Sequence, residues 1–402
     1  MDAPDAGAAR RRDSAGMTTN LHTAPLRVVV AGGGVAGMEA VLALRELAGE
    51  RVEITLLAPE STFAYRPMSV AVPFGRGHVQ RLALADFARE TSTRLVRGAL
   101  TAVEPGRVLT STGAALPYDA LLVAVGAWSE PAVPGAMTWT PDLDQDVMGG
   151  LLADVEEGYA KRVAFVVPDG AGWPLPAYEL ALMTAWDARD MGQDDVEVVI
   201  STPESAPLAI FGEQASASLQ EDLDGAGVTV RTGRHDTSGL AGMRVIALPR
   251  AAARRIHGLP RDEHGFVPVD RHGRVHGLDG VWAAGDCTAF PIKQGGLAAQ
   301  QADAAAASIA ERAGADVVPA PFSPVLRGVL LTGRGRRWIR RSLETAADHG
   351  EAQRRALWWP PTKVAGERLS PYLALHADGR LPGDERPDGR FVELPVPVGG
   401  PS

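Results

Sequence analysis

The segment RVVVAGGGVAGMEAVLALREL, residues 27–47, decides the fold class of this chain. Its apolar run at residues 28–30 predicts a buried strand, and the apolar side chains after the glycines recur at helical spacing. Between them, Gly32, Gly34 and Gly37 form a G-x-G-x-x-G turn. The first glycine makes the tight turn, the second lets backbone approach a pyrophosphate, and the third allows close helix packing. The segment therefore predicts a dinucleotide site at a helix N-terminus.

A second strand follows this helix at the spacing that such a site requires. The run RVEITLLAPE, residues 51–60, is apolar and ends near Glu60. A carboxylate at the end of this strand can accept a hydrogen bond from a ribose hydroxyl. The acid more often falls where Ala58 stands, so a solvated loop position for Glu60 is the alternative interpretation.

Two later stretches strengthen the prediction. They are LPYDALLVAVGAW, residues 116–128, and GLDGVWAAGDCTAF, residues 277–290. Each is an apolar strand that ends in small residues, so backbone can pass close to a ligand there. The second also delivers Asp286 to the carboxyl end of its strand, where open α/β sheets bind ligands.

These three motifs, in this order, resemble the flavoproteins with two dinucleotide-binding folds, the pyridine nucleotide-disulfide oxidoreductase-like superfamily. The resemblance covers residues 26–315 and implies FAD as the cofactor. It implies that Asp286 binds the ribityl chain, while Val125 replaces a usual threonine and removes a hydroxyl contact. The implied cofactor-binding residues of the three motifs are Gly32, Gly34, Val35, Ala36, Gly37, Ala124, Val125, Gly126, Gly285 and Asp286.

The resemblance extends to two neighbouring segments. The helix that begins near Gly296 would direct its N-terminus, with Leu297, toward the flavin pyrimidine carbonyl and stabilise the charge of reduced flavin. Lys293 is a nearby cation and a candidate catalytic residue, with simple solvation as the alternative. In the loop STFAYRPMSVAV, Arg66 is expected beside the cofactor together with Phe63 and Pro67.

A second unit of the same kind is predicted between the two halves of the FAD-binding fold. Strands at residues 162–168, 196–202 and 228–232 alternate with helices at 175–190 and 212–227. This β-α-β-α-β order implies a parallel sheet with right-handed crossovers. The predicted class is α/β, with two Rossmann-like folds. The predicted parts are a disordered extension (1–25), the FAD-binding fold (26–145 and 263–318), an inserted NAD(P)-like fold (146–262) and a C-terminal region (319–402).

The second glycine turn is damaged. In DGAGWPLPAYELA, residues 169–181, Gly172, Pro174 and Ala177 occupy the three glycine positions. Pro174 and Pro176 lack the N–H groups that would face a pyrophosphate, although proline is well tolerated in a first helical turn. Hydrogen bonds to a charged group contribute roughly 1.5–3 kcal/mol each. Losing two predicts NAD(P)H binding weakened by roughly a hundredfold to ten-thousandfold.

The run WPLPAYE is similar to that of the sulfide:quinone oxidoreductase and type II NADH dehydrogenase branch. In that branch the glutamate matching Glu179 faces the flavin region, so Glu179 is a candidate for holding a substrate or relaying a proton. Interaction with the helix dipole is the alternative role. Trp173 stands near the position of a reactive cysteine in the sulfide enzymes, and Trp173 and Tyr178 are predicted to line the substrate pocket.

Cys287 is the single cysteine of the chain. This excludes a disulfide framework, a redox dithiol and a polysulfide held between two cysteines. A lone thiol beside a cofactor strand is more simply interpreted as packing than as a nucleophile. The nine histidines show no zinc-ligand spacing, so no metal site is predicted.

Charge and hydropathy limit the partners. The net charge of −9 disfavours a nucleic-acid binder, and no apolar stretch reaches the ~18 residues of a spanning helix, so a cytoplasmic protein is predicted. The C-terminal region nevertheless interleaves Trp338 and Ile339 with a basic cluster. This pattern is open to two interpretations, peripheral contact with an anionic membrane or a solvated face whose tryptophans pack on the FAD-binding fold. The cluster comprises Arg327, Arg334, Arg336, Arg337, Arg340 and Arg341.

The sequence favours an FAD-dependent oxidoreductase that passes electrons from an unidentified small-molecule donor to a quinone-like or other acceptor. Two alternatives stay open. One is an NAD(P)H dehydrogenase that binds nicotinamide in an unusual pose, and the other is a flavoprotein without turnover, in which FAD is structural or redox-sensing. The sequence leaves the oligomeric state open.

Overall fold

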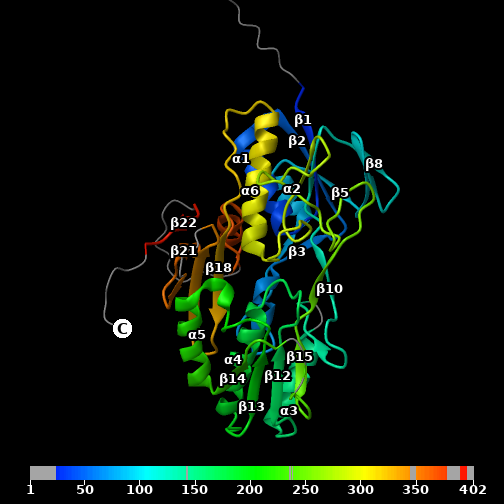
Figure 1. The fold of residues 1–402 in the computed structure, drawn as a ribbon. Coiled ribbons are helices and arrows are strands. Elements are labelled where there is room, and N and C mark those ends of the chain that lie inside the picture. The colour runs from blue at the N-terminus through cyan, green and yellow to red at the C-terminus, as the bar shows by residue number, and fades with distance from the viewer. Residues whose placement is uncertain are drawn as a thin grey trace, which may run out of the picture.

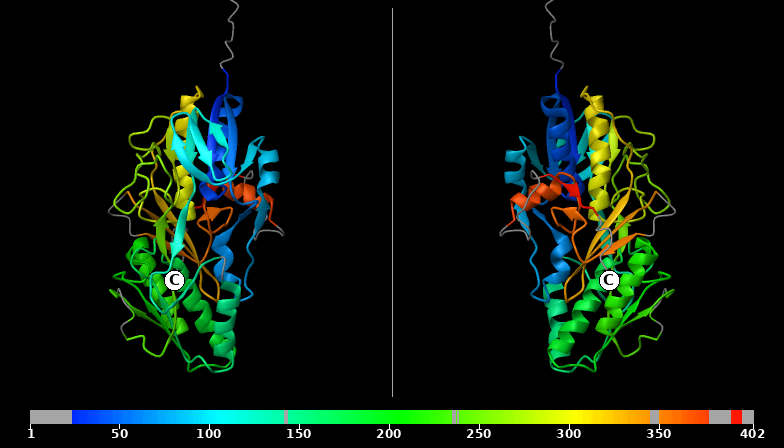
Figure 2. Two further views of the ribbon diagram at one scale, coloured as in Figure 1. Left: turned by 90° about the vertical axis from the view of Figure 1, so that its right-hand side faces the viewer. Right: turned by 90° about the vertical axis from the view of Figure 1, so that its left-hand side faces the viewer.

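The computed structural model describes residues 24–141, 144–234, 237, 239–344, 350–377 and 390–395. The extension predicted for residues 1–25 falls almost wholly outside the described residues. Two parallel sheets lie at opposite ends of the molecule, and the C-terminal strands lie between them (Figures 1 and 2).

The first sheet has five parallel strands and forms from two distant parts of the chain. The last strand to join, β17 (Val281–Ala283), pairs with β9 (Ala120–Val123) in the register Val281↔Leu121. Helices α1 (Val35–Ala48) and α6 (Gly295–Arg312) pack together over one face of this sheet. An antiparallel meander covers the other face, formed by β6 (Leu100–Glu104), β7 (Arg107–Thr110) and β8 (Ala115–Pro117). The strand order of the sheet is β17 (Val281–Ala283), β9 (Ala120–Val123), β1 (Leu26–Ala31), β2 (Val52–Ala58) and β5 (Arg94–Arg97).

The second sheet repeats this arrangement. Its strand order is β11 (Met137–Thr138), β15 (Arg244–Ala247), β12 (Arg162–Val166), β13 (Glu197–Ser201) and β14 (Val228–Arg231). The run β15-β12-β13-β14 corresponds to β9-β1-β2-β5, and all of these pairings are parallel. The helices of this unit are α3 (Asp144–Glu156), α4 (Leu175–Asp190) and α5 (Glu213–Ala226). The predicted α/β class with two Rossmann-like folds is therefore confirmed.

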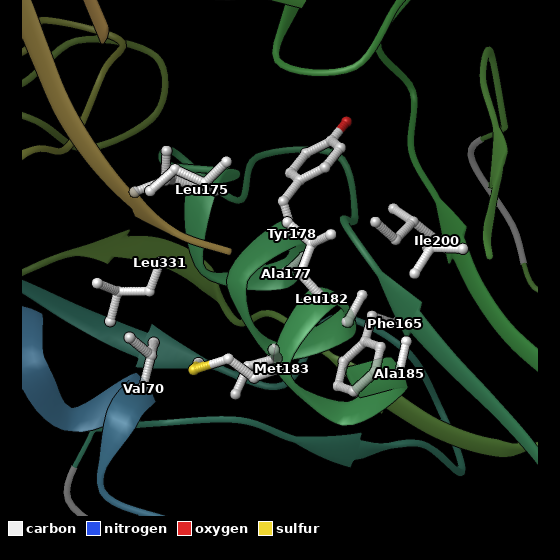
Figure 3. Close-up of a cluster of buried hydrophobic side chains, with 14 of the residues drawn as sticks. Val70, Phe165, Leu175, Ala177, Tyr178, Leu182, Met183, Ala185, Ile200 and Leu331 are labelled. Atoms are coloured by element: carbon white, nitrogen blue, oxygen red, sulfur yellow. The ribbon is translucent and has the colours of Figure 1, made fainter. Parts of the chain in front are cut away.

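Helix α4 is buried on nearly all sides, which explains why its sequence shows little amphipathic pattern. Figure 3 shows its apolar side chains surrounded by three different elements. Phe165 and Ile200 approach from the second sheet, Leu331 from the C-terminal strand β18 (Val325–Leu331), and Val70 from the short helix η2 (Arg66–Ala71). This packing fixes α4, and with it Glu179, relative to the rest of the molecule.

The C-terminal region folds into strands that the sequence analysis did not predict. An antiparallel sheet contains β18 (Val325–Leu331), β19 (Arg336–Ser342) and β20 (Glu351–Gln353). The chain continues through β21 (Trp358–Trp359) and α7 (Leu369–Leu375) to β22 (Val392–Glu393), which pairs with β21.

This arrangement overturns the proposed membrane contact through Trp338 and Ile339. Both side chains are buried, and Trp338 packs edge-to-face on Trp358 with the ring centroids 4.7 Å apart. The tryptophans thus pack within the C-terminal region and not on the FAD-binding fold. The arginines are largely neutralised by ion pairs: Arg327 with Glu393, Arg334 with Asp190, Arg337 with Asp222, and Arg340 with Glu351 and Glu393. Within the described ranges, no helix is long and apolar enough to cross a membrane.

The remaining short elements connect these layers. Strand β10 (Ala127–Glu130) pairs antiparallel with β16 (Arg250–Ala253) where the chain passes between the two sheets. The others are η1 (Gly49–Arg51), β3 (Thr62–Ala64), β4 (Arg81–Ala83), α2 (Leu84–Glu90) and η3 (Ala209–Phe211).

Candidate functional site

The first glycine turn has the geometry of a pyrophosphate cradle. Gly32 has φ of 127°, and a Cβ there would lie 2.1 Å from the Ala124 carbonyl oxygen. A Cβ on Gly37 would lie 1.8 Å from the Gly32 carbonyl oxygen. Gly34 instead faces open space, with no atom within 4 Å of the Cβ position. Two glycines are thus required by backbone contact, and the third leaves room for a ligand at the N-terminus of α1.

Asp286 lies near the carboxyl end of β17 and is half-buried in the wall of a pocket. The preceding Gly285 donates its N–H to Gln301 Oε1 at 2.7 Å, which fixes the turn. Across the described part of the chain, no protein donor forms a hydrogen bond with the Asp286 carboxylate. Burial raises the pKa of Asp286, and the Lys293 ammonium lowers it in part. A carboxylate in this position fits the hydroxyl groups of a bound ribityl chain.

The pocket lies where the first sheet, the second unit and the C-terminal region meet. The structure brings six of the predicted site residues together in its wall, with a charged residue that the sequence analysis missed. The six are Arg66, Pro67, Trp173, Glu179, Asp286 and Lys293, and the charged residue is Lys363.

Glu179 and Lys363 form a buried ion pair in this wall. The Lys363 ammonium donates to Glu179 Oε1 and Oε2 at 2.6 and 2.8 Å, and the Leu331 N–H donates to Oε1 at 2.9 Å. Only 1% of the Glu179 side chain and 7% of the Lys363 side chain are exposed. Burial raises the pKa of Glu179 and lowers that of Lys363, while each opposes the shift of the other.

The composition of the chain could have pointed to Lys363. Among 40 basic residues the chain has only three lysines, Lys161, Lys293 and Lys363, and two of these line the pocket. Lysine presents a compact point charge whose pKa changes readily on burial, a property that arginine lacks. In a chain this rich in arginine, the presence of two of the three lysines in the pocket wall could have drawn attention to Lys363.

Lys293 is part-buried in the pocket wall and is held by several protein contacts. Its ammonium donates to the Thr288 and Phe290 carbonyl oxygens at 2.6 and 2.8 Å and lies 3.6 Å from the centre of the Phe266 ring. Burial lowers its pKa. Its backbone N–H donates to the Gly172 carbonyl at 3.1 Å. We infer that Lys293 holds the loop after Asp286 against the second glycine turn.

The other predicted cofactor contacts are distributed around the first turn. Helix α6 begins at Gly295, next to Gly296, but the Leu297 N–H donates to the capping Gln294 side chain at 2.8 Å. That amide is therefore already satisfied. Glu60 is exposed after β2, and Val125 and Gly126 follow Ala124 beside Gly32.

The second glycine turn lies between the loop that carries Lys293 and the pocket. A Cβ on Gly172 would lie 2.9 Å from Lys293 Cγ, and Pro174 occupies the N-cap of α4. Trp173 lines the pocket and packs edge-to-face on Phe211, with the ring centroids 5.8 Å apart.

Tyr178 is not a pocket residue, contrary to the sequence prediction. Its side chain is fully buried, and its hydroxyl donates to Glu204 Oε2 at 2.8 Å. The Thr202 hydroxyl donates to the same oxygen at 3.0 Å. Glu204 lies just beyond β13, where a Rossmann fold places the acid that binds a nucleotide ribose. Tyr178 and Thr202 thus both donate to one oxygen of a carboxylate in that position.

Cys287 is buried and its Sγ lies 3.4 and 3.3 Å from the carbonyl oxygens of Val123 and Ala284. Burial, with the neighbouring Asp286, raises its pKa to about 11. The thiol is therefore protonated at neutral pH, which agrees with a packing role.

Two Rossmann-like folds, a phosphate cradle, a strand-end carboxylate and a shared pocket define the class of FAD-dependent oxidoreductases with two dinucleotide-binding folds. The chain belongs to the pyridine nucleotide-disulphide oxidoreductase family, whose model matches residues 26–239. FAD is the cofactor of this family, and the residues of the first turn and Asp286 fit it.

Individual proteins that resemble this chain share less than 30% of its residues over the matched region. The chain is 27% identical to the ferredoxin reductase component of chlorobenzene dioxygenase from Cupriavidus sp. (strain PS12), over 74% of this chain and 77% of that protein. It is 29% identical to an NADH dehydrogenase-like protein from Mycobacterium tuberculosis (strain CDC 1551 / Oshkosh), over 65% and 73%. The sulfide:quinone oxidoreductase of Aquifex aeolicus superposes with a TM-score of 0.71 at 18% identity, covering 82% of this chain and 86% of that one. At this identity the structural likeness shows the fold alone.

Proposed function

We propose that this oxidoreductase passes electrons from a donor other than NAD(P)H to a quinone-like acceptor bound in the pocket. The buried Glu179–Lys363 pair in the pocket wall is the observation that carries this proposal. FAD, held by the first glycine turn and Asp286, would supply the two-electron chemistry.

The shape and chemistry of the pocket support a flat, apolar acceptor. Three tryptophans and several prolines contribute to its walls, including Trp128, Trp139, Trp173, Pro67 and Pro249. Aromatic side chains favour stacked or edge-on contacts with a planar ring. A few convergent polar groups in an otherwise apolar pocket are typical of small-molecule sites.

The ion pair supplies what reduction of a quinone oxygen requires, a proton donor in a dry setting. Burial raises the pKa of Glu179 and lowers that of Lys363, so the neutral pair lies closer in energy to the ionic pair than it would in water. Lys363 can therefore donate a hydrogen bond, or the single proton that the pair holds, to an acceptor oxygen. The pair is then left one proton short and takes a replacement from solvent, with the Glu179 carboxylate able to accept it.

The second turn supports the exclusion of nicotinamide as donor. Pro174 and Pro176 present no N–H to a phosphate, and the Glu204 carboxylate already accepts from Tyr178. Lys293 packs against Gly172 on the side of the turn that faces the pocket.

The donor is tested by anaerobic mixing of the purified flavoprotein with NADH, NADPH, sulfide and a reduced quinone analogue, following the flavin absorbance. We expect micromolar NADH and NADPH to leave the flavin oxidised. Rapid bleaching by either nucleotide would overturn the exclusion of nicotinamide and favour an unusual binding pose. A tightly held flavin that no donor reduces would favour the role without turnover.

The acceptor is tested independently of the donor. Flavin reduced with dithionite, with excess reductant removed, is mixed with a soluble quinone analogue and its reoxidation is timed. We expect Lys363→Met to slow reoxidation about a hundredfold, within the range contributed by a positioned acid. The matched control is Lys161→Met, since Lys161 is a surface residue paired with Asp195 and should reoxidise at the wild-type rate. Equal rates in both variants would contradict a role for Lys363.

A further inference from the structure

The segment of residues 360–370, here called the strap, carries Lys363 to the pocket. It runs from the end of β21 into the first residues of α7, and up to Arg368 it contains no helix or strand. Regular hydrogen bonding therefore cannot fix the position of Lys363. Hydroxyl groups within the strap fix its local shape, since Thr362 Oγ1 and Ser370 Oγ both donate to the Val364 carbonyl at 2.6 Å. The placement of the strap relative to the two folds depends on side chains outside it.

Glu39 on α1 provides the most buried of these contacts. Its side chain is 0% exposed, and its two carboxylate oxygens accept the N–H groups of Arg368 and Leu369 at 2.7 and 2.9 Å. The strap passes in contact with this carboxylate, since a Cβ on Gly366 would lie 2.3 Å from Glu39 Oε2. Glu39 begins the second turn of the helix that starts at the FAD-binding glycines.

Other side chains complete the attachment. The Arg368 guanidinium pairs with Asp303 on α6 and with Glu46 on α1, each at 2.8 Å. On the pocket side, Tyr65 Oη accepts the Val364 N–H at 2.7 Å. Val364 is adjacent to Lys363 and also lines the pocket.

A buried arrangement of this kind is seldom selected for stability alone. Glu39 and Asp303 face each other with Arg368 as their nearby cation, while Glu46 and Glu367 approach the same guanidinium. Buried ionic groups often contribute no more stability than apolar side chains of similar size, but they can specify one geometry. The geometry specified here is the course of the strap between α1 and the pocket.

We propose that Glu39 is a positioning residue that acts through the strap to hold Lys363 against Glu179 at the pocket. The catalytic value of that position rests on the function proposed above, but the positioning itself does not. The effect passes from Glu39 through Arg368 and Leu369 to the strap, and Tyr65 fixes the other end.

The three lysines of the chain allow a direct test. Holoprotein grown with lysine labelled with ¹³C at Cε gives three lysine side-chain signals, which Lys161→Met, Lys293→Met and Lys363→Met assign. In Glu39→Gln we expect the Lys363 signal to move toward that of an exposed lysine. We also expect its modification by trinitrobenzenesulfonate at about pH 8, above the pKa of about 7 that burial gives Glu39, to accelerate at least about tenfold, the effect of losing one charged hydrogen bond. The signal of Lys161 should not move.

Two further variants make the outcome decisive. Glu46→Gln is the matched control, because Glu46 is 63% exposed and exposed ion pairs contribute little, so the Lys363 signal should stay in place. Tyr65→Phe removes the acceptor of the Val364 N–H and should release Lys363 even if Glu39→Gln fails to fold. An unchanged Lys363 signal in folded Glu39→Gln, or in Tyr65→Phe where the first variant does not fold, would overturn the proposal.

The same samples separate the two proposals. If Lys363 is released but wild-type flavin is never reoxidised by quinone, positioning stands and the proposed acceptor fails. If positioning holds together with the function, reoxidation slows in Glu39→Gln in parallel with the change in the Lys363 signal.

Discussion

Among single residues, Glu179 and Lys363 show how a charged pair can be retained inside an apolar wall. Each ion is nearly inaccessible to water, so its burial is compensated only by the partner and by the Leu331 N–H. Neither side chain can be removed alone without leaving the other as an unpaired buried charge. Stability therefore depends on the pair, whereas the chemistry proposed for the pocket depends on Lys363.

We expect Lys363→Met to lower the free energy of unfolding by about 3–5 kcal/mol, the usual effect of breaking a buried ion pair. The double variant Glu179→Leu/Lys363→Met should recover most of this loss, because no buried charge remains. Urea unfolding of the two variants and the wild type measures both effects. A single variant as stable as the wild type would show that the pair is hydrated in solution.

Among the elements, the β1–turn–α1 unit contains glycines of two kinds. Two are needed because backbone atoms lie too close for a side chain, and one is needed to leave room for a ligand. At Gly32 and Gly37, neighbouring carbonyl oxygens occupy the space that a Cβ would need. Gly34 instead faces open space, and its φ of −88° is one that any residue can adopt. The turn before α4 has kept its helix start and lost the phosphate donors, since proline supports the first helical turn but donates no N–H.

This distinction predicts opposite behaviour of two alanine variants. Gly34→Ala should leave the apoprotein about as stable as the wild type and weaken FAD binding at least about tenfold, since its methyl group occupies the pyrophosphate space. Gly37→Ala should destabilise the fold itself, because its Cβ would overlap the Gly32 carbonyl. Flavin titration and thermal unfolding of the apoproteins measure these effects. Gly150→Ala, in α3 with open space around it, is the control and should bind FAD normally.

In the molecule as a whole, the chain passes from the first nucleotide fold to the second and back, and the strap then runs along the pocket between the two folds. The strap contacts α1 through Glu39 and α4 through Lys363, so it connects both folds at the pocket. The position of the site therefore depends on the C-terminal region, which lies beyond the part matched by the family model.

The buried Glu39 predicts a pH dependence of stability. Burial raises its pKa from 4.5 to about 7, so the folded state holds a proton that the unfolded state releases. Its contribution is complete below about pH 4.5 and is lost as the pH rises through 7, a change of up to ~3 kcal/mol. Burial beside Glu39 also raises the pKa of Asp303, with the same sign. Unfolding curves between pH 4.5 and 8 should therefore be flatter for Glu39→Gln than for the wild type, and parallel curves would contradict the assignment.

The sequence by itself determined the two parallel sheets, the glycine turn and the place of Asp286 at a strand end, which follow from local hydrophobic periodicity and from turns in which particular residue types are required. The approach of Glu179 to the same region was implied by the resemblance to a known branch. Only the tertiary structure decided what the pocket contains. Lys363 lies 184 residues from Glu179, Tyr178 turns toward Glu204, and Trp338 packs on Trp358. Such contacts join segments that are distant in the sequence, and the local pattern of one segment does not indicate which residue of the other it will contact. Burial and pairing are therefore determined only in the folded chain.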